Sequence, residues 1–192
     1  MRQTGKFLIL FCMLILFALS RKAFCEEDSF QGSINIGIDS GIYQIDYTHT
    51  SAIDSVNGRT TASQPTIGVN LFASIPLPVV PKYSPFTIIS QAGFNYNFPV
   101  DNLSISYSFA NIIFKNNLSF DIAGHFGFGA LYSLWNQEIS GGFGWQVLAG
   151  AENSEGLYMG LRYLSIPGSK LSGGYQSKYV LSQWVFDINY SF

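Results

Sequence analysis

One short segment of the sequence has the residue types that nucleophilic catalysis requires. His49 and Ser51 are separated by one residue, and Asp54 follows shortly after. A serine hydrolase needs a hydroxyl nucleophile, a base that takes its proton and an acid that orients the base. Spacing alone does not create these contacts, and a polar strand end has the same composition. We therefore expect His49 and Ser51 to be ordinary strand-end residues and the protein not to be an enzyme.

A second set of polar residues is spread along the chain at positions that alternate with apolar ones. If these side chains share an enclosed interior, each charge needs a partner, because an unpaired buried charge is strongly destabilising. Arg162 is the only cation in the set, and we expect it to pair with Glu152 and Asp187 on neighbouring strands. The predicted interior network consists of Arg162, Glu152, Asp187, Asp121, His125, Gln91 and Gln146.

His125 is the residue of this set that could act as an acid, a base or a metal ligand. Asp121 lies on the same strand face, but about 13 Å of strand separates two residues that are four positions apart. We therefore interpret His125 as a hydrogen-bonded structural residue. No group of cysteine, histidine and carboxylate residues has the spacing of a metal site. The glycines do not lie between a strand and a helix, as a nucleotide-binding loop requires. We expect no metal and no cofactor.

The elements that would hold these residues are strands. From Trp184 to Phe192, apolar side chains occupy every even position, and Asp187, Asn189 and Ser191 occupy odd ones. Successive side chains of a strand point to opposite faces, so this segment has one apolar and one mostly polar face. Similar alternation recurs along the chain from Ser33 onward. The pattern predicts an all-β domain.

Composition decides between a soluble and a membrane β-domain. The 192 residues suffice for one domain. Only 11% of them are charged, compared with about 25% in a typical soluble domain. No apolar run after the N-terminal region is long enough for a transmembrane helix, whereas a closed barrel pairs every backbone group in lipid. A soluble sandwich or a lipocalin-like barrel would also alternate. Aromatic residues near both ends of nearly every strand favour the membrane barrel.

The N-terminus has the features of a secretory signal peptide. Arg2 and Lys6 form a basic start, residues 7–19 are apolar, and small residues occupy Ala23 and Cys25. We predict cleavage after Cys25, so that the signal peptide spans 1–25 and the barrel domain spans 26–192.

Two alternatives remain for this region. Residues 18–20 form a weaker cleavage site, and Cys25 could instead be retained as a lipid attachment site, although Lys22 and Phe24 fit that signal poorly. Removing residues 1–25 changes the formal net charge from −2 to −6 and leaves no cysteine. A mildly acidic chain argues against nucleic acid as a partner.

The strand count depends on Asp39-Ser40-Gly41, where the alternation changes phase. A hairpin there gives nine strands and a bulge gives eight. Bacterial single-chain barrels have even strand numbers, so we predict eight strands with a bulge. The bulge would keep Tyr43, Ile45 and Tyr47 on the lipid face. The longer external loops are predicted at Ser51–Gln64, Asn136–Gly142 and Ile166–Lys178.

The same pattern assigns residues to the two faces of the barrel wall. On the fourth predicted strand, Ile105, Tyr107 and Phe109 are assigned to the lipid face. Further residues are predicted to face the interior: Gln44, Asp46, Asn70, Asn95, Asn97, Ser104, Ser106 and Ser108.

The last segment resembles the C-terminal signature of bacterial outer-membrane β-barrels. Phe192 ends the chain, Tyr190 lies two residues before it, and apolar residues alternate upstream. The resemblance implies that the barrel-insertion machinery recognises an insertion signal formed by Phe192, Tyr190, Ile188, Phe186 and Trp184. The whole pattern resembles small eight-stranded barrels such as the OmpA transmembrane domain and the OmpX/Ail group. It implies an integral outer-membrane protein in contact with membrane lipids and lipopolysaccharide.

Three functions follow as hypotheses. The first is a non-enzymatic surface protein whose external loops bind a host or surface ligand, because rigid scaffolds commonly carry binding residues on their loops. The second is a narrow pore, suggested by the small interior residues. The third is a lipid A-modifying enzyme, because the lipid A deacylase family has a His-x-Ser spacing like that of His49 and Ser51. In this chain, however, Ala52 occupies the position of that family's asparagine, no glutamate follows at a matching distance, and the motif lies on a different strand.

Overall fold

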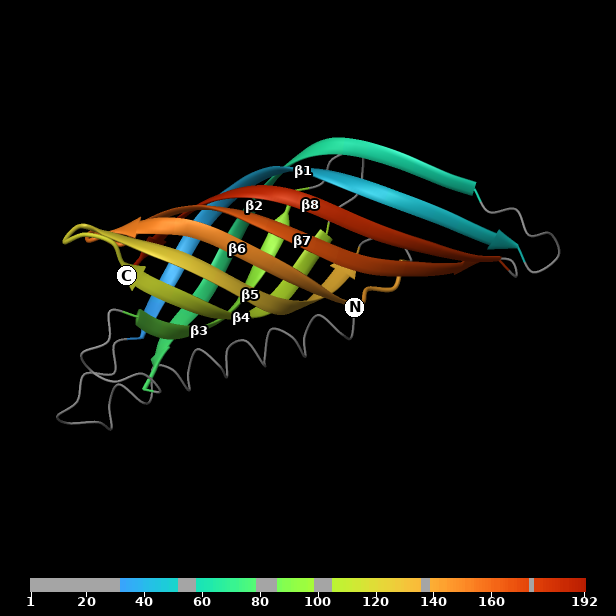
Figure 1. The fold of residues 1–192 in the computed structure, drawn as a ribbon. Coiled ribbons are helices and arrows are strands. Elements are labelled where there is room, and N and C mark those ends of the chain that lie inside the picture. The colour runs from blue at the N-terminus through green and yellow to red at the C-terminus, as the bar shows by residue number, and fades with distance from the viewer. Residues whose placement is uncertain (1–31, 52–57, 79–85, 99–104, 136–138, 173–174) are drawn as a thin grey trace.

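The protein is a closed antiparallel barrel of eight strands (Figure 1). The computed structural model describes residues 32–51, 58–78, 86–98, 105–135, 139–172 and 175–192. Each strand pairs with its neighbours in sequence, and β1 closes the barrel against β8. The predicted eight-stranded barrel is confirmed. The strands are β1 (Ser33–Ser51), β2 (Gly58–Leu77), β3 (Phe86–Asn97), β4 (Ile105–Asn117), β5 (Ile122–Trp135), β6 (Phe143–Asn153), β7 (Leu157–Ser172) and β8 (Tyr175–Ser191).

The outer surface of the barrel is apolar on every strand. On β8, Trp184 is 62% exposed and Phe192, just beyond the strand, is 73% exposed. Exposed large hydrophobic residues occur on the other seven strands as well. Aromatic rings also contact one another across strands: Tyr163 lies 5.5 Å from Trp145 and 4.9 Å from Trp184, measured between ring centroids. An apolar surface of this extent suits lipid and would promote association in water. In the part of the chain that the structure describes, no helix has the length and hydropathy needed to cross a membrane.

Strand β1 contains no bulge, so this part of the prediction was wrong. Its register is continuous against β8, from Asn35 opposite Ser191 to Ser51 opposite Tyr175. Even-numbered side chains therefore face outward throughout: Ile42 is 60% exposed, and Tyr43 is buried inside.

Gln44 and Asp46, predicted to face the interior, consequently lie on the outward side of β1. The strand keeps one alternation throughout, but in its second half the apolar side chains Tyr43 and Ile45 pack into the barrel interior. The sequence pattern therefore inverts without any backbone irregularity, and the side chain of Tyr47 lies outside the described part.

The inward and outward faces of strand β4 are reversed relative to the prediction. Ile105, Tyr107 and Phe109 are buried in the interior. Ser106 and Ser108 alternate with them and therefore face outward, and Ser104 lies outside the described residues. The register places Ser106 opposite Tyr96 of β3, and residues directly opposite one another share a face of the sheet. The two outward serines therefore lie beside aromatic residues of the neighbouring strands.

Two of the predicted external loops are mostly strand. The pairing of β1 with β2 continues to His49 opposite Gly58, and that of β7 with β8 continues to Ser172 opposite Tyr175. Within the predicted loops Ser51–Gln64 and Ile166–Lys178, only residues 52–57 and 173–174 lie outside the described strands. In the third loop, Ser140 forms an isolated bridge with Ser169 of β7.

These long strands form a sheet that projects from one end of the barrel (Figure 1). Pairing between β2 and β3 stops at Gly68 opposite Asn97, and pairing between β6 and β7 stops at Trp145 opposite Ser165. Beyond these points the sheet consists of β2, β1, β8 and β7 in that order. We call it the projecting sheet, and its end of the barrel the loop end.

The opposite end of the barrel carries short turns and the chain terminus at Phe192, and we call it the terminal end. The β6–β7 turn uses Gly156 with a φ of 86°, a left-handed conformation that glycine adopts without strain. The side-chain oxygen of Asn153 accepts hydrogen bonds from the backbone amides of Glu155 and Leu157. Asp121 lies in the β4–β5 turn and is exposed. The prediction that it faces the interior was wrong, because β5 begins only at Ile122.

Candidate functional site

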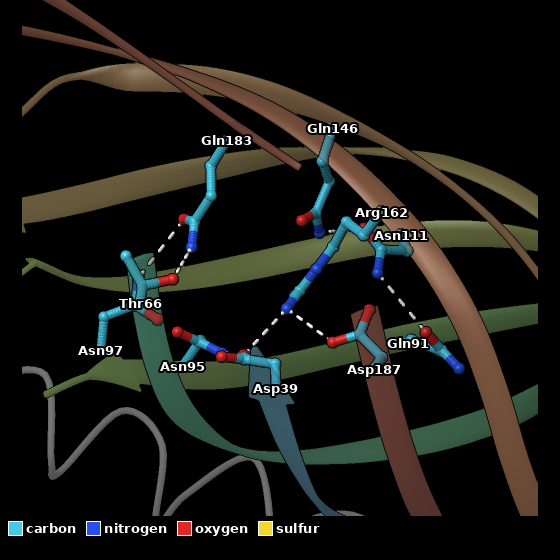
Figure 2. Close-up of polar contacts among 10 residues, drawn as sticks. All are labelled: Asp39, Thr66, Gln91, Asn95, Asn97, Asn111, Gln146, Arg162, Gln183 and Asp187. Carbon is cyan, nitrogen blue, oxygen red and sulfur yellow. Dashed lines mark hydrogen bonds and ion pairs between the residues drawn. The ribbon is translucent and has the colours of Figure 1, made fainter. Parts of the chain in front are cut away.

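The interior is centred on the guanidinium group of Arg162, which reaches from β7 between two carboxylates (Figure 2). Its Nη2 donates to Asp187 Oδ1 on β8 at 2.8 Å and to Asp39 Oδ2 on β1 at 3.0 Å. All three side chains are at most 6% exposed. Asn95 of β3 donates to the same oxygen of Asp39 through its Nδ2. The ring of Tyr107 lies 5.7 Å from the guanidinium carbon, a distance suited to a cation–π contact. These contacts link β1, β3, β4, β7 and β8.

Amide side chains form a second chain of contacts across the barrel. Gln146 of β6 donates to Asn111 Oδ1 at 2.7 Å, and Asn111 of β4 donates to Gln91 Oε1 at 3.4 Å (Figure 2). Strand β5 lies between β4 and β6, and the register places Gly129 between Asn111 and Gln146. A Cβ at Gly129 would lie 2.0 Å from Asn111 Oδ1 and 2.3 Å from the carbonyl oxygen of Ala110. Glycine is therefore required for these two amides to meet.

A third polar group lies nearer the loop end. Gln183 of β8 donates to Thr66 Oγ1 of β2 at 2.6 Å and accepts from Asn97 of β3 at 3.4 Å. This group places three more polar side chains at interior positions of the closed wall.

The carboxylate of Glu152 lies at the terminal mouth and not beside Arg162. Its Oε2 contacts Lys115 Nζ at 2.6 Å and His125 Nε2 at 3.0 Å. The latter contact is an ion pair when His125 is protonated. The ring of Tyr158 lies 5.4 Å from that of His125. The interior charges thus form two separate groups, one central and one at the mouth.

Sequence reasoning missed two charged residues of these groups. Asp39 was assigned to an irregular segment and Lys115 was not among the predicted interior residues, but both lie on regular strands with inward-facing side chains. Continuous alternation through Ile36, Ile38 and Ile42 would have assigned Asp39 to the interior. The expected Arg162–Asp187 contact is present, whereas Glu152 has other partners.

An apolar cluster closes the interior on the loop-end side of Arg162. Its side chains come from the loop-end halves of β1, β4, β5, β7 and β8. On β7 these residues come after Arg162 in the sequence, and on β8 they come before Asp187. We call it the apolar plug, and its members are Tyr43, Ile105, Tyr107, Leu131, Leu164, Ile166, Leu181 and Val185, each no more than 5% exposed.

On the other side of Arg162 the interior is open. A cavity of about 550 Å³ extends from the Arg162 group to the terminal mouth. Polar side chains of all eight strands take part in its lining. The interior is therefore asymmetric along the barrel axis, with the plug at the loop end and a polar cavity at the terminal end.

Other predicted site residues have different settings. His49 and Ser51 lie two residues apart at the loop end of β1, while Asp54 lies outside the described residues. The signal-cleavage residues Ala23 and Cys25 also lie outside them. On the terminal segment, Trp184, Phe186, Tyr190 and Phe192 are exposed on the outer surface and Ile188 is partly exposed. In the described part of the chain, no three metal-binding side chains of the His, Cys, Asp or Glu type come together.

The outer surface and the interior together define the class of protein. A closed barrel satisfies its backbone internally, and here it presents apolar residues and aromatic rings outward on all strands. The protein is a transmembrane β-barrel of the bacterial outer-membrane type. Such barrels have short turns on the periplasmic side and longer loops outside. We therefore assign the terminal end, with its short β4–β5 and β6–β7 turns, to the periplasmic side and the loop end to the exterior.

Comparison with known proteins gives structural likeness only. No protein-family model matches the chain, and no curated protein matches its sequence. Neisserial surface protein A is 12% identical, with a TM-score of 0.47 over 84% of this chain and 99% of that protein. Ail, the attachment invasion locus protein of Yersinia pestis, is 10% identical, with a TM-score of 0.39 over 82% and 98%. The outer membrane enzyme PagL is 10% identical, with a TM-score of 0.45 over 79% and 98%.

Proposed function

We propose that this protein is a non-enzymatic surface barrel that binds a partner through the projecting sheet and does not conduct solutes. The observation that carries the proposal is a stretch of the β2 edge that its described neighbours leave unpaired. The last contact on the β3 side is the hydrogen bond from Phe98 to Ile67, and none of the residues that the structure describes pairs with residues 58–66 on that side. An unpaired edge offers backbone donors and acceptors to another extended chain.

The register identifies which residues of β2 face this edge. In an antiparallel ladder the backbone groups of one residue point to the same neighbour, and successive residues alternate. The carbonyl oxygen of Ile67 accepts from the amide of Phe98, hence toward the β3 side. The odd-numbered residues before Ile67 point the same way: Arg59, Thr61, Ser63 and Pro65. Pro65 has no amide hydrogen, so the donors available at the edge belong to Arg59, Thr61 and Ser63.

The other edge of the projecting sheet is partly covered. Ser169 of β7 exchanges two backbone hydrogen bonds with Ser140, at 2.8 and 3.1 Å. This bridge occupies β7 near the middle of its projecting part. The β2 edge is therefore the better candidate for strand addition, and the proposed partner contains an extended peptide segment.

A proline substitution tests the edge directly. Ser63→Pro removes one outward amide and leaves the pairing of β2 with β1, which uses the even-numbered residues. We expect bacteria displaying this variant to adhere to cultured host cells several-fold less than bacteria displaying the unaltered protein. The matched control Ser63→Ala keeps the amide and should adhere normally. Equal adhesion of all three proteins, or adhesion no greater than that of cells without the protein, would refute the proposal.

The apolar plug supports the absence of conduction. Eight buried apolar side chains and the Gln183 group occupy the loop-end half, and the interior of an eight-stranded barrel has room only for side chains or one small ligand. We expect the refolded protein to give no discrete current steps in a planar bilayer. Reproducible single-channel steps would instead support the narrow pore.

The terminal segment is proposed to serve as the insertion signal. Its exposed aromatic residues face outward, and the ring centroids of Tyr190 and Phe192, near the terminal end, lie 4.9 Å apart. Phe192→Asp should lower the amount of folded barrel in the outer membrane, because it removes the terminal aromatic group. Heat-dependent gel mobility of membrane fractions would measure this amount, and an unchanged folded fraction would contradict the assignment.

A further inference from the structure

The polar cavity at the terminal end is not used by the proposed surface function. Its volume of about 550 Å³ lies within the range of roughly 300–1,000 Å³ that is usual for small-molecule sites. Its roof is the Arg162 group, and beyond the roof the apolar plug closes the path to the exterior. A molecule in this cavity would therefore enter and leave through the periplasmic mouth.

Neutral side chains that form hydrogen bonds are the most numerous class in the lining. Amide and hydroxyl side chains contribute from six of the eight strands or their ends, and they are Ser33, Asn35, Asn70, Ser74, Thr87, Gln91, Asn111, Asn117, Tyr158, Asn189 and Ser191. A core of this barrel diameter could have been filled mostly with apolar residues, as the loop-end half is. The polar lining therefore distinguishes this half from a region that is merely packed.

Several buried polar atoms of the lining lack a partner within the described protein. They are Asn70 Oδ1, Asn189 Oδ1, the hydroxyl of Tyr158 and Nε of Arg162. The first two atoms accept hydrogen bonds, Nε donates, and the hydroxyl can do both. Since buried polar groups are nearly always hydrogen-bonded, these atoms indicate a ligand or water that offers donors and acceptors together.

Each charged side chain of the cavity contacts one of opposite charge. At the mouth, Lys115 and His125 both contact Glu152. At the roof, Arg162 lies between Asp39 and Asp187, so this group has a formal excess of one negative charge. This excess opposes an anionic ligand, and both carboxylates are already held by Arg162 and so do not await a cation. A neutral ligand fits this arrangement.

Two aromatic rings add an apolar surface to this polar lining. Phe72 of β2 and Phe109 of β4 both line the cavity. Their ring centroids lie 5.9 Å apart and their planes are inclined by 59°. A ligand with hydroxyl groups on its edges and an apolar face would satisfy the amides and pack against these rings.

We propose that this cavity binds a small neutral polyhydroxylated molecule, a sugar of one or two rings, taken up from the periplasmic side. A sugar carries hydroxyl groups that donate and accept at once, which matches the mixed set of unpaired atoms. It is uncharged, which matches the paired charges. The plug makes the site a dead-end pocket and not a step in transport across the membrane.

The test uses the complete mature protein, refolded in a zwitterionic detergent that contains no sugar. Glucose and maltose are titrated separately and followed by chemical-shift changes of the protein amides, with inorganic phosphate as a charged comparison. We expect saturable shifts with at least one sugar and none with phosphate. The absence of saturable shifts with both sugars would mean that the cavity holds water only and would overturn the proposal, as would tighter binding of phosphate.

Matched substitutions locate the binding. Asn70→Leu and Asn189→Leu each remove an unpaired acceptor of the cavity, and we expect about tenfold weaker binding in each. Asn116→Leu makes the same change on β4 at a position outside the cavity lining and should bind as the unaltered protein does. Equal affinity in all variants would refute the site, as would equal weakening by Asn116→Leu.

Two further variants keep the result independent of folding and of the surface function. Thr87→Trp places a large ring in the cavity lining and should abolish binding, even if the leucine variants fold poorly. Its folded fraction is checked by heat-dependent gel mobility, and binding retained by the folded variant would contradict the proposal. Ser63→Pro, which tests the projecting sheet, should leave sugar binding unchanged.

Discussion

Arg162 and Leu164 lie two residues apart on β7, and both side chains point into the barrel. Arg162 belongs to a polar half in which charges and amides contact one another across the barrel. Leu164 belongs to the apolar plug and is fully buried. The same strand geometry therefore accommodates two kinds of interior. The stability of the polar half depends on specific hydrogen-bond and ion-pair partners, whereas that of the plug depends on how completely its side chains fill the space. Substitutions should have different consequences in the two halves.

The largest effect is expected at the centre of the polar half. Arg162→Leu leaves Asp39 and Asp187 buried without their cation. Removing one partner of a buried ion pair typically costs about 3–5 kcal/mol. Urea titration of the barrel in lipid vesicles, followed by tryptophan fluorescence, measures the change in the free energy of unfolding. A triple variant that adds Asp39→Asn and Asp187→Asn should recover much of the loss. If Arg162→Leu is as stable as the unaltered protein, the central group contributes nothing to the polar half.

A smaller effect is expected in the plug. Leu164→Ala removes buried volume that its neighbours cannot refill, and such substitutions cost about 2–5 kcal/mol. Leu161→Ala is the matched control on the same strand, because Leu161 is 54% exposed on the outer surface, where lipid can occupy the space. The same urea titration compares the two. Equal losses at both positions would show that the plug is no better packed than the lipid-facing surface.

The smallest effect is expected at the terminal mouth. The side chains of Lys115 and Glu152 are 29% and 16% exposed, and ion pairs that reach solvent contribute about 0.2–1 kcal/mol. Lys115→Met should therefore change the free energy of unfolding by no more than this amount. A loss comparable to that of Arg162→Leu would mean that the mouth and the centre act as one network and would remove the distinction between them.

The sequence by itself determined the class of the fold. The alternation on β2, β3 and β5 to β8 assigned those side chains to the correct faces, because strand geometry allows only two directions. The even-number rule then settled the number of strands. The inward positions of Gln91, Gln146, Arg162 and Asp187 followed from the same two-residue period. These features depend on local backbone geometry, which a single sequence expresses.

Only the tertiary structure decided which interior residues meet. Asp39 reaches Arg162 because β1 closes on β8 and β8 pairs with β7, a closure that no local pattern encodes. Glu152 meets Lys115 and His125 because the register of β4, β5 and β6 places these three positions close together. The reversed faces on β4 and the loop-end half of β1 have a related cause. Apolar residues face lipid around the membrane but turn inward where they fill the plug, and a hydrophobic pattern is the same in both cases.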